Sequence, residues 1–350
     1  GRIAGHNCRA ILNTNGLELA AVCDLEIEKA NVYHDEFGVP AFSNYHRMLT
    51  EIIDIDIVAI ITPSGMHFEH SLDVLKKYNK HIIVEKPTFM RPSQLNEAYD
   101  VAENLGLKIF PIFQNRHNLA VQRVKKALKN NELGDIRVIG VRVRWCRPQR
   151  YYDMAPWRGT LSHDGGALTN QGIHHVDLLR YLGGEVSKVN ATMRTLGANI
   201  EAEDTIVSSF TYENNAIGSL EVTTAARPDD FEASISIVGS KGLAQIGGIA
   251  VNELQIFTPN PDECETYSED FSDCVYGEGH KMLYDDIYSS MANGEDYSVT
   301  KKDCFQSIRL LNAFYRSNEK SNWQIVDEDG ESANLGKENN KISNLYRTVE

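Results

Sequence analysis

Residues 56–87 read DIVAIITPSGMHFEHSLDVLKKYNKHIIVEKP, two short apolar runs with an amphipathic stretch between them. The runs, DIVAIITP (56–63) and KHIIVEKP (80–87), are short and uniformly apolar, which is typical of strands covered on both faces. The intervening HFEHSLDVLKKYN (67–79) has apolar positions three and four residues apart, which indicates a helix. The stretch therefore predicts a strand–helix–strand unit of a parallel sheet.

The same rhythm extends on both sides of this unit. LELAAVCD (17–24) before it and LKIFPIFQ (107–114) after it have the composition of further buried strands. Because strands alternate with amphipathic helices, residues 1–117 are predicted to form an α/β dinucleotide-binding domain, the Rossmann fold.

The first residues, Gly1-Arg2-Ile3-Ala4-Gly5, are similar to the second half of a GxGxxG or GxGxxA turn. In dinucleotide-binding folds this turn follows the first strand, and its amides and the next helix bind the pyrophosphate. Gly1, Arg2, Ile3 and Ala4 are therefore candidate cofactor-binding residues. Because the first strand is central in the usual strand order, we expect about ten residues containing it to precede Gly1 in the whole protein.

Asp24 ends the strand predicted over 17–24, about 20 positions after the glycine turn, where a carboxylate accepts hydrogen bonds from the adenosine ribose. A carboxylate there repels the 2′-phosphate of NADP, so Asp24 favours NAD as the cofactor. The alternative is that Asp24 caps the helix predicted over EIEKANVYHDEFG (26–38).

The pattern changes after residue 118. A helix predicted over LAVQRVKKALKNN (119–131) leads into alternating apolar and polar runs, which are typical of antiparallel strands with one solvated face. Residues 118–350 are therefore predicted to form an α+β domain with a large, mostly antiparallel open sheet. The runs are DIRVIGVRVRW (135–145), KVNATMRTL (188–196), TIVSSFTY (205–212), AIGSLEVTTAA (216–226) and EASISIVGS (232–240).

The last part of the chain returns to helical spacing. LYDDIYSSMANG (283–294) and CFQSIRLLNAFYRSNEK (304–320) predict two helices, whereas ESANLGKENNKISN (331–344) is polar and is expected to be loosely structured.

Composition excludes several classes of protein. The formal net charge of −14 opposes general binding to nucleic acid or to anionic membranes. No run approaches the roughly 20 apolar residues of a membrane span, and the first residues do not have the pattern of a signal peptide, so a cytoplasmic location is expected. The six cysteines form no CxxC pair, so neither a metal site nor a disulfide framework is expected.

Two motifs in the first half resemble those of a known family. Thr62-Pro63 with His67 looks like a TPxxxH turn, and Glu85-Lys86-Pro87 looks like an EKP motif. Together they resemble the glucose–fructose oxidoreductase and inositol dehydrogenase family, Gfo/Idh/MocA, over most of the chain. The resemblance implies NAD as cofactor, a cis peptide bond before Pro87, and cofactor contacts from Thr62, Pro63, His67, Glu85 and Lys86. No catalytic metal is expected, because the sequence has no HxxxH or carboxylate cluster and hydride transfer needs none.

Lys86 has a chemical reason to lie in this motif. In alcohol oxidation a hydroxyl loses its proton while its carbon gives up a hydride, and an adjacent ammonium stabilises the developing alkoxide. Lys86 follows a predicted parallel strand, where sheets of this class bind ligands. The alternative is a surface lysine in a turn.

The second half contains DGGALTNQGIHHVD (164–177), which is similar to the family's glycine-rich entry into a helix that carries DxxxH. On one helix, Asn170 and His174 would share a face, and Asp177 would lie one turn further, beside His174. His174 is the candidate general base, because imidazole titrates nearest neutral pH. The alternatives are a buried structural histidine for His174 and, for His175, a structural role on another face.

Asn170 departs from the inositol dehydrogenase pattern, which has aspartate at that position. Since an amide cannot accept a proton, Asn170 would only orient the substrate, and Lys86 and His174 would carry proton transfer. The asparagine resembles the family branch that acts on nucleotide-linked aminosugar acids.

Two loops are candidates for ligand recognition. Phe113–His117 resembles the family's loop leaving the cofactor domain, in which Gln114 would approach the nicotinamide and Arg116 the substrate. RPQRYYDMAPWRGT (147–160) combines arginines, which bind carboxylates or diphosphates, with aromatic rings that cover sugars. Trp157 and Arg158 are its favoured contacts, and a domain-interface loop is the alternative. Gly279–Tyr284 is also similar to the sugar-nucleotide branch, with helix capping as its alternative.

These features predict an NAD-dependent oxidoreductase that oxidises a secondary ring hydroxyl, first of all C3 of a UDP-linked N-acetylaminosugar uronate. An inositol-type or free-sugar dehydrogenase is the alternative. Two others are a non-catalytic regulator that senses NAD or a sugar, and a glycosidase that oxidises its substrate transiently. Partners other than a sugar or sugar nucleotide are expected to be copies of the same chain, in a dimer or tetramer formed through the C-terminal sheet.

Overall fold

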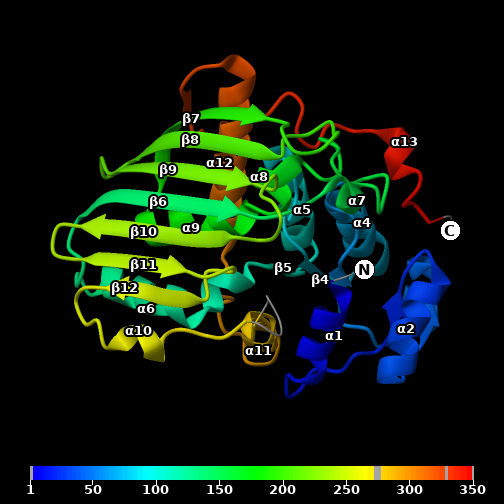
Figure 1. Ribbon diagram of the computed structural model, residues 1–350. Helices are drawn as coiled ribbons and strands as arrows, with labels where there is room; N and C mark the ends of the chain where they lie inside the picture. The colour runs from blue at the N-terminus through cyan, green and yellow to red at the C-terminus, as the bar shows by residue number, and fades with distance from the viewer. Residues whose placement is uncertain (1–2, 272–276, 328–329, 349–350) are drawn as a thin grey trace.

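The computed structural model describes residues 3–271, 277–327 and 330–348. Figure 1 shows a large twisted sheet beside a smaller half that contains the N-terminus. Among the described residues, no helix is both long and apolar enough to cross a membrane.

The N-terminal half has short parallel strands with helices around them. All the strands predicted for this half are confirmed, although the one expected over 17–24 pairs only at Val22–Cys23. The strands are β1 Val22–Cys23, β2 Ala41–Phe42, β3 Ile57–Ile60, β4 His81–Val84 and β5 Ile109–Pro111. The helices are α1 Ala4–Leu12, α2 Ile27–Phe37, α3 Tyr45–Glu51, α4 His67–Asp73, which continues as the π-helix η2 Val74–Tyr78, and α5 Pro92–Asn104.

These strands form two separate sheets, β1–β2 and β3–β4–β5, instead of one continuous sheet. No strand of the described residues lies between β1 and β3 to join them. Each strand pair is parallel, as Ile57–His81 and Ile83–Phe110 illustrate. The carboxyl ends of β3, β4 and β5 therefore meet at one edge, where the TPxxxH turn, the EKP motif and the loop at Gln114 follow.

The second half is built on an eight-stranded sheet with the order β12-β11-β10-β6-β9-β8-β7-β13. All neighbouring strands are antiparallel except β6 and β9, which confirms the expected mostly antiparallel sheet. The strands are β6 Ile136–Arg144, β7 Val186–Arg194, β8 Thr205–Tyr212, β9 Ile217–Thr223, β10 Glu232–Gly239, β11 Leu243–Gly247, β12 Glu253–Phe257 and β13 Gln324–Ile325.

One face of this sheet is covered and the other is open. Helices α6 Leu119–Lys129, α9 Ile173–Gly183 and α12 Lys301–Lys320 pack on the covered face (Figure 1). In β8, Ile206, Ser208, Phe210 and Tyr212 are buried on this face, whereas Val207 is 58% exposed on the other. The period-two alternation in the sequence therefore correctly indicated a sheet with one solvated face.

Short helices complete this half. They are α7 Gln149–Tyr152, α8 Gly166–Asn170 and α10 Glu263–Thr266. The first half contains two 3-10 turns, η1 Ser64–Met66 and η3 Gln114–His117. Helix α12 confirms the helix predicted over 304–320 and begins with a capping box between Thr300 and Asp303.

Helix α11, Gly279–Ala292, follows β12 in sequence but packs with the first half. Its Leu283, Tyr284 and Ile287 share a buried cluster with Ile83 of β4 and Phe110 of β5. The domain boundary at residue 117 stays a prediction, and this helix lies beyond it in the chain while contributing to the core of the first half.

The segment 331–344 is more ordered than its polar composition suggested. Leu335 is buried, Glu331 forms an ion pair with Arg91 at 2.5 Å, and Asn340–Ser343 form helix α13. The expectation of a loose tail is wrong, because one apolar anchor and a partly buried ion pair fix the segment against α5.

Candidate active site

Lys86 lies directly after β4 and connects the two halves of the protein. Its Nζ donates a hydrogen bond to the main-chain oxygen of Asn170 at 2.7 Å. The peptide bond between Lys86 and Pro87 is cis, as expected. Burial lowers the pKa of Lys86, while the carboxylates of Glu85 and Asp164 oppose that shift. An ammonium group is thus held among carboxylates at the edge where the parallel strands end.

Glu85 does not face outward as a cofactor ligand would. It is 5% exposed, accepts hydrogen bonds from the side chain of Asn7 and the amide of Lys86, each at 3.1 Å, and lies 3.8 Å from His280. Burial alone would raise its pKa, but His280, Lys86 and Asn7 together lower it to about 2. Glu85 ties β4 to α1 and α11, so the structure does not support a direct cofactor contact.

His67 of the TPxxxH motif is also turned inward. Its ring nitrogens lie 2.8 Å from the carbonyl oxygen of Pro87 and 2.9 Å from that of Thr62, and burial lowers its pKa. The ring therefore lies between the two turns, and a cofactor contact from His67 stays a prediction. Thr62 is exposed and Pro63 half-buried, so these two remain candidates for cofactor contact.

The glycine-rich segment is not one continuous helix. Helix α8 ends at Asn170 and α9 begins at Ile173, so the expectation that Asn170 and His174 share one helical face is wrong. The side chain of Asn170 instead donates to Asp164, whose other oxygen accepts from the amide of Gly159 at 2.6 Å. Burial raises the pKa of Asp164, and its hydrogen bonds and Arg158 oppose that shift.

Asp164 is a site residue to which the sequence reasoning gave no role. It is 1% exposed and contributes to the electrostatic environment of Lys86. The sequence signal that could have identified Asp164 is its position directly before Gly165 and Gly166, because two glycines allow a tight turn beside it.

His174 lies on α9 close to the loop that follows β5. It is 6% exposed, and its Nε2 is 3.3 Å from the side-chain nitrogen Nε2 of Gln114. Burial, and then the positive charge of Lys86, hold its pKa well below the usual range. The imidazole is therefore neutral at neutral pH and has a lone pair with which to accept a proton.

His175 points elsewhere. Its ring is fully buried and nearly perpendicular to the ring of Trp145, and neither nitrogen has a hydrogen-bond partner among the described residues. Burial lowers its pKa to about 4.

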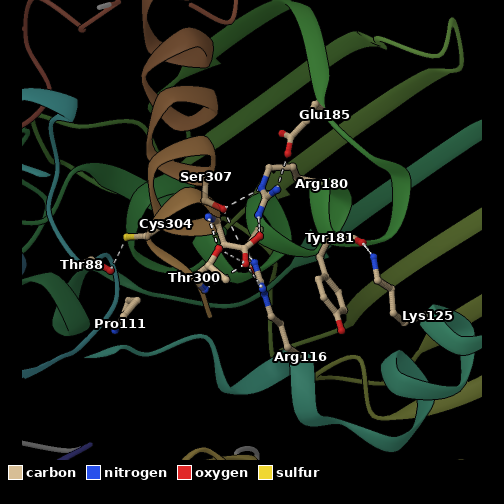
Figure 2. A network of polar contacts seen from close by, with 12 residues as sticks. Thr88, Pro111, Arg116, Lys125, Arg180, Tyr181, Glu185, Thr300, Cys304 and Ser307 are labelled. Carbon is tan, nitrogen blue, oxygen red and sulfur yellow. Dashed lines mark hydrogen bonds and ion pairs between the residues drawn. The ribbon is translucent and has the colours of Figure 1, made fainter. Parts of the chain in front are cut away.

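Arg116 and Asp177 do not have the positions expected of them. Their side chains are 4% and 1% exposed, and Arg116 donates to both oxygens of Asp177 at 2.7 and 2.6 Å. Arg116 also pairs with Asp303 of α12 at 3.3 Å, and Arg180 binds the other oxygen of Asp303. Figure 2 shows this network, which joins the loop after β5 to α9 and α12.

This network corrects two assignments. Arg116 has its guanidinium committed to two carboxylates, so it is not available to a substrate. Asp177 bonds to Arg116 and to Ser307, at 2.8 Å, instead of supporting His174. Both residues support neighbours that face the site. Arg116 lies in the same turn as Gln114, and Asp177 lies one helical turn after His174.

The arginine-rich loop forms a stacked cluster near Lys86. The guanidinium of Arg158 lies 4.2 Å from the ring centre of Tyr151 and 4.7 Å from that of Trp157. Arg147 lies 5.7 Å from the same tyrosine ring and pairs with Asp230 at 2.8 Å. The positive charges of Arg147 and Arg158 both lower the pKa of Lys86, so the three cations lie close enough to interact, with the carboxylates of Glu85 and Asp164 beside Lys86.

The expected pyrophosphate turn is only partly described. Gly1 and Arg2 lie outside the described residues, whereas Ile3 and Ala4 lie at the N-terminal end of α1. That end provides free amides and a favourable dipole for phosphate. Asp24 accepts a hydrogen bond from the amide of Glu26 at 3.1 Å just before α2, a capping-type contact, and its ribose contact stays a prediction.

Several buried polar atoms near Lys86 lack a partner within the described chain: Gln114 Oε1, His174 Nδ1 and Arg158 Nε. Buried polar groups are normally hydrogen-bonded, so these atoms fit a site completed by a polar ligand such as a nicotinamide and a sugar. In the described part of the chain, no group of three or more His, Cys, Asp or Glu side chains is arranged to hold a metal ion.

Comparison with known proteins gives matches over both halves. The family described as "Oxidoreductase family, NAD-binding Rossmann fold" matches residues 1–113, and the "GFO/IDH/MocA C-terminal domain" matches residues 121–245. The crystal structure of the WlbA dehydrogenase from Bordetella pertussis, in complex with NADH and UDP-GlcNAcA, is 34% identical with a TM-score of 0.87. That comparison covers 93% of this chain and 95% of the WlbA chain.

Named relatives act on other sugars and polyols. D-glucoside 3-dehydrogenase from Escherichia coli is 28% identical over 72% of this chain and 74% of its own length. Myo-inositol 2-dehydrogenase from Thermotoga maritima is 23% identical over 94% of this chain and 97% of its own length.

Proposed function

Because the chain belongs to the Gfo/Idh/MocA family and is an NAD-dependent sugar or polyol dehydrogenase, we propose that it oxidises C3 of a UDP-linked N-acetylaminosugar uronate. The observation that carries this proposal is the group of Lys86, Arg147 and Arg158 cations beside the Tyr151 and Trp157 rings. Cations next to aromatic rings suit a sugar with carboxylate and diphosphate groups. The similarity to a dehydrogenase crystallised with UDP-GlcNAcA supports the same substrate class.

Lys86 and His174 have distinct roles in the proposed reaction. Bound NAD supplies the acceptor for the hydride that leaves the ring carbon. Lys86 Nζ already donates to Asn170 and has two further protons with which to stabilise the developing alkoxide. His174 accepts the hydroxyl proton at Nε2, where the substrate hydroxyl takes the place of the Gln114 amide.

The other proposed contacts orient the ligands. Asn170 is fixed by Asp164 and positions the sugar without taking part in proton transfer. Trp157 and Arg158 contact the substrate, and Gln114 contacts the nicotinamide end of the cofactor.

The experiment that tests this function measures NADH formation at 340 nm with UDP-GlcNAcA, myo-inositol, D-glucose and a methyl glucoside. Turnover of UDP-GlcNAcA at the highest kcat/KM supports the proposal. A higher kcat/KM on myo-inositol or a free sugar would contradict the proposed substrate and would identify the protein as a polyol or free-sugar dehydrogenase instead. Product structure by NMR then shows whether C3 carries the ketone.

Arg158→Met should raise KM for UDP-GlcNAcA by about 10–100-fold, because a charge-assisted contact contributes about 1.5–3 kcal/mol. The change in kcat should be smaller, since the arginine contacts substrate in the ground state and the transition state alike. Arg150→Met is the matched control, because Arg150 is exposed in the same loop. Equal KM values for the two variants would contradict a substrate role for Arg158.

Asp24→Ser should reduce the preference for NAD over NADP. The carboxylate repels a 2′-phosphate and hydrogen-bonds a ribose hydroxyl, so its loss is expected to weaken NAD binding by about tenfold or more. The ratio of kcat/KM for NAD to that for NADP measures the effect. If the ratio is unchanged, Asp24 serves only the capping contact with Glu26.

The open face of the large sheet supports assembly with further copies of the chain. Val138, Val207, Ile217 and Val238 are exposed on its strands. Apolar side chains on an unpaired sheet face are typical of protein interfaces. We expect sedimentation equilibrium to show a dimer or tetramer formed through this face. Val207→Lys should shift the equilibrium between oligomer and monomer toward the monomer.

A further inference from the structure

Glu203 is a buried carboxyl group with no role so far. It precedes β8 and is 6% exposed. Its main-chain oxygen accepts a hydrogen bond from Ala167 at 2.9 Å, and its Oε1 accepts one from the amide of Leu168 at 3.0 Å. One residue thus binds the first turn of α8 through both its main chain and its side chain.

The glycine-rich turn is shaped around this carboxyl group. Gly166 has a φ of +81°, and a Cβ added there would lie 2.2 Å from Glu203 Oε2. Glycine is therefore required at this position for two reasons, its backbone conformation and the close approach of Glu203.

Tyr315 of α12 holds the same turn from the other side. Its hydroxyl contacts the carbonyl oxygen of Gly165 and lies 2.8 Å from Thr169 Oγ1 and 2.8 Å from Glu203 Oε1. A phenol has one proton to donate. That hydroxyl donates to Glu203 Oε1 and lies within reach of two further oxygens of the same turn, so Tyr315 links α12 to the carboxyl group and to residues 165–169.

The held turn leads directly to both proposed catalytic residues. Helix α8 ends at Asn170, whose carbonyl oxygen accepts the hydrogen bond from Lys86 Nζ. The amide of Gly172 donates to Ala167 at 2.8 Å, and α9 with His174 starts at the next residue. A shift of Ala167 or Leu168 therefore moves the partner of Lys86 and the start of the helix that carries His174.

We propose that Glu203 is a positioning residue that together with Tyr315 fixes the 165–168 turn and so aligns Lys86 with His174. The proposal rests on the catalytic roles proposed above for those two residues. The titratable groups that face Glu203 are Tyr315 from α12 and Asp164 from the loop before α8. Burial, with a further contribution from Asp164, raises the pKa of Glu203 to about 8, against the hydrogen bonds from Leu168 and Tyr315.

The first test measures stability against pH in Glu203→Gln, which keeps the shape of the neutral acid. Glutamate in an unfolded chain titrates near pH 4.3, so the folded wild type holds an extra proton from there to about pH 8. Its stability relative to the variant is full below that window and falls as pH rises through it. The gap in urea midpoint, variant minus wild type, should widen between pH 5 and 8 and then stay constant.

Parallel curves for the two proteins across this pH range would contradict the raised pKa of Glu203. Glu201→Gln is the matched control, because Glu201 is exposed two residues earlier and accepts from the amide of Leu161. Its curve should run parallel to that of the wild type. This test needs no substrate, so it stands even if UDP-GlcNAcA is not turned over.

The second test separates positioning from folding. At pH 7, the kcat of Glu203→Gln should stay within about threefold of the wild-type value. The kcat of Glu203→Ala should fall roughly hundredfold, the loss that a ~1 Å misplacement can cause. NAD affinity, measured by fluorescence, should be equal in both. The assay uses whichever sugar of the panel the wild type oxidises fastest. Wild-type kcat in Glu203→Ala, or an equal loss in both variants, would overturn the proposal.

Discussion

Lys86→Met is expected to lower kcat by about 10²–10⁴-fold, the contribution typical of a positioned proton-transfer group. The variant keeps the length and apolar stem of the side chain but removes the ammonium that would stabilise the alkoxide. It also removes the hydrogen bond to Asn170, the 2.7 Å contact between the two halves. The measurement is NADH formation at saturating NAD and substrate, with NAD affinity determined separately.

Lys80→Met provides the matched control for this result. Lys80 lies just before the same strand and also donates to a main-chain oxygen, that of Ile53 at 3.1 Å, but on the exposed surface. Its variant should retain wild-type kcat. If Lys86→Met also retains kcat, the ammonium has a structural role, and His174 alone carries the proton transfer.

The positions of the catalytic candidates could be predicted because they depend on local sequence. Strands β4 and β5, which end shortly before Lys86 and Gln114, are short apolar runs, and parallel strands bring their carboxyl ends to one edge. The motif that begins at Asp164 approaches this edge from the second half. The contact between Lys86 and Asn170 is the result of that meeting.

The direction of individual side chains could not be predicted in the same way. His67 and Glu85 belong to motifs that border the cofactor region, yet both point into the protein, where Pro87 and Asn7 bind them. A motif places a residue along the chain, whereas the side chain's partner depends on elements that pack from elsewhere in the sequence. Asn7 comes from α1, which is remote from Glu85 in sequence.

Glu203 shows this limit most clearly. No motif marks it, and its neighbours on β8 follow the ordinary alternation of a half-buried strand. It becomes significant only because Leu168 and Tyr315, from two other elements, converge on its carboxyl group. Glu203 lies in the acidic stretch EAED (201–204) just before β8, so the sequence itself contains no signal that this carboxyl group is buried.

Asp177→Ala is expected to destabilise the protein by about 3–5 kcal/mol, because it leaves the buried Arg116 guanidinium without its bidentate partner. Asp303 compensates only in part, since Arg180 also binds it. Urea unfolding at pH 7 measures the loss. As a control, Arg47→Ala breaks the exposed pair with Glu51 and should cost only about 0–1 kcal/mol.

A double variant separates the cost of an unpaired charge from the value of the pair. Arg116→Met combined with Asp177→Leu removes both charges, and apolar replacement of a buried ion pair is often neutral or stabilising. It should recover more than half of the stability that Asp177→Ala loses. We nevertheless expect its kcat to be below that of the wild type, because the pair joins the turn of Gln114 to the helix of His174, whose side chains lie 3.3 Å apart in the intact protein. Recovery of both stability and kcat would show that the network serves folding alone.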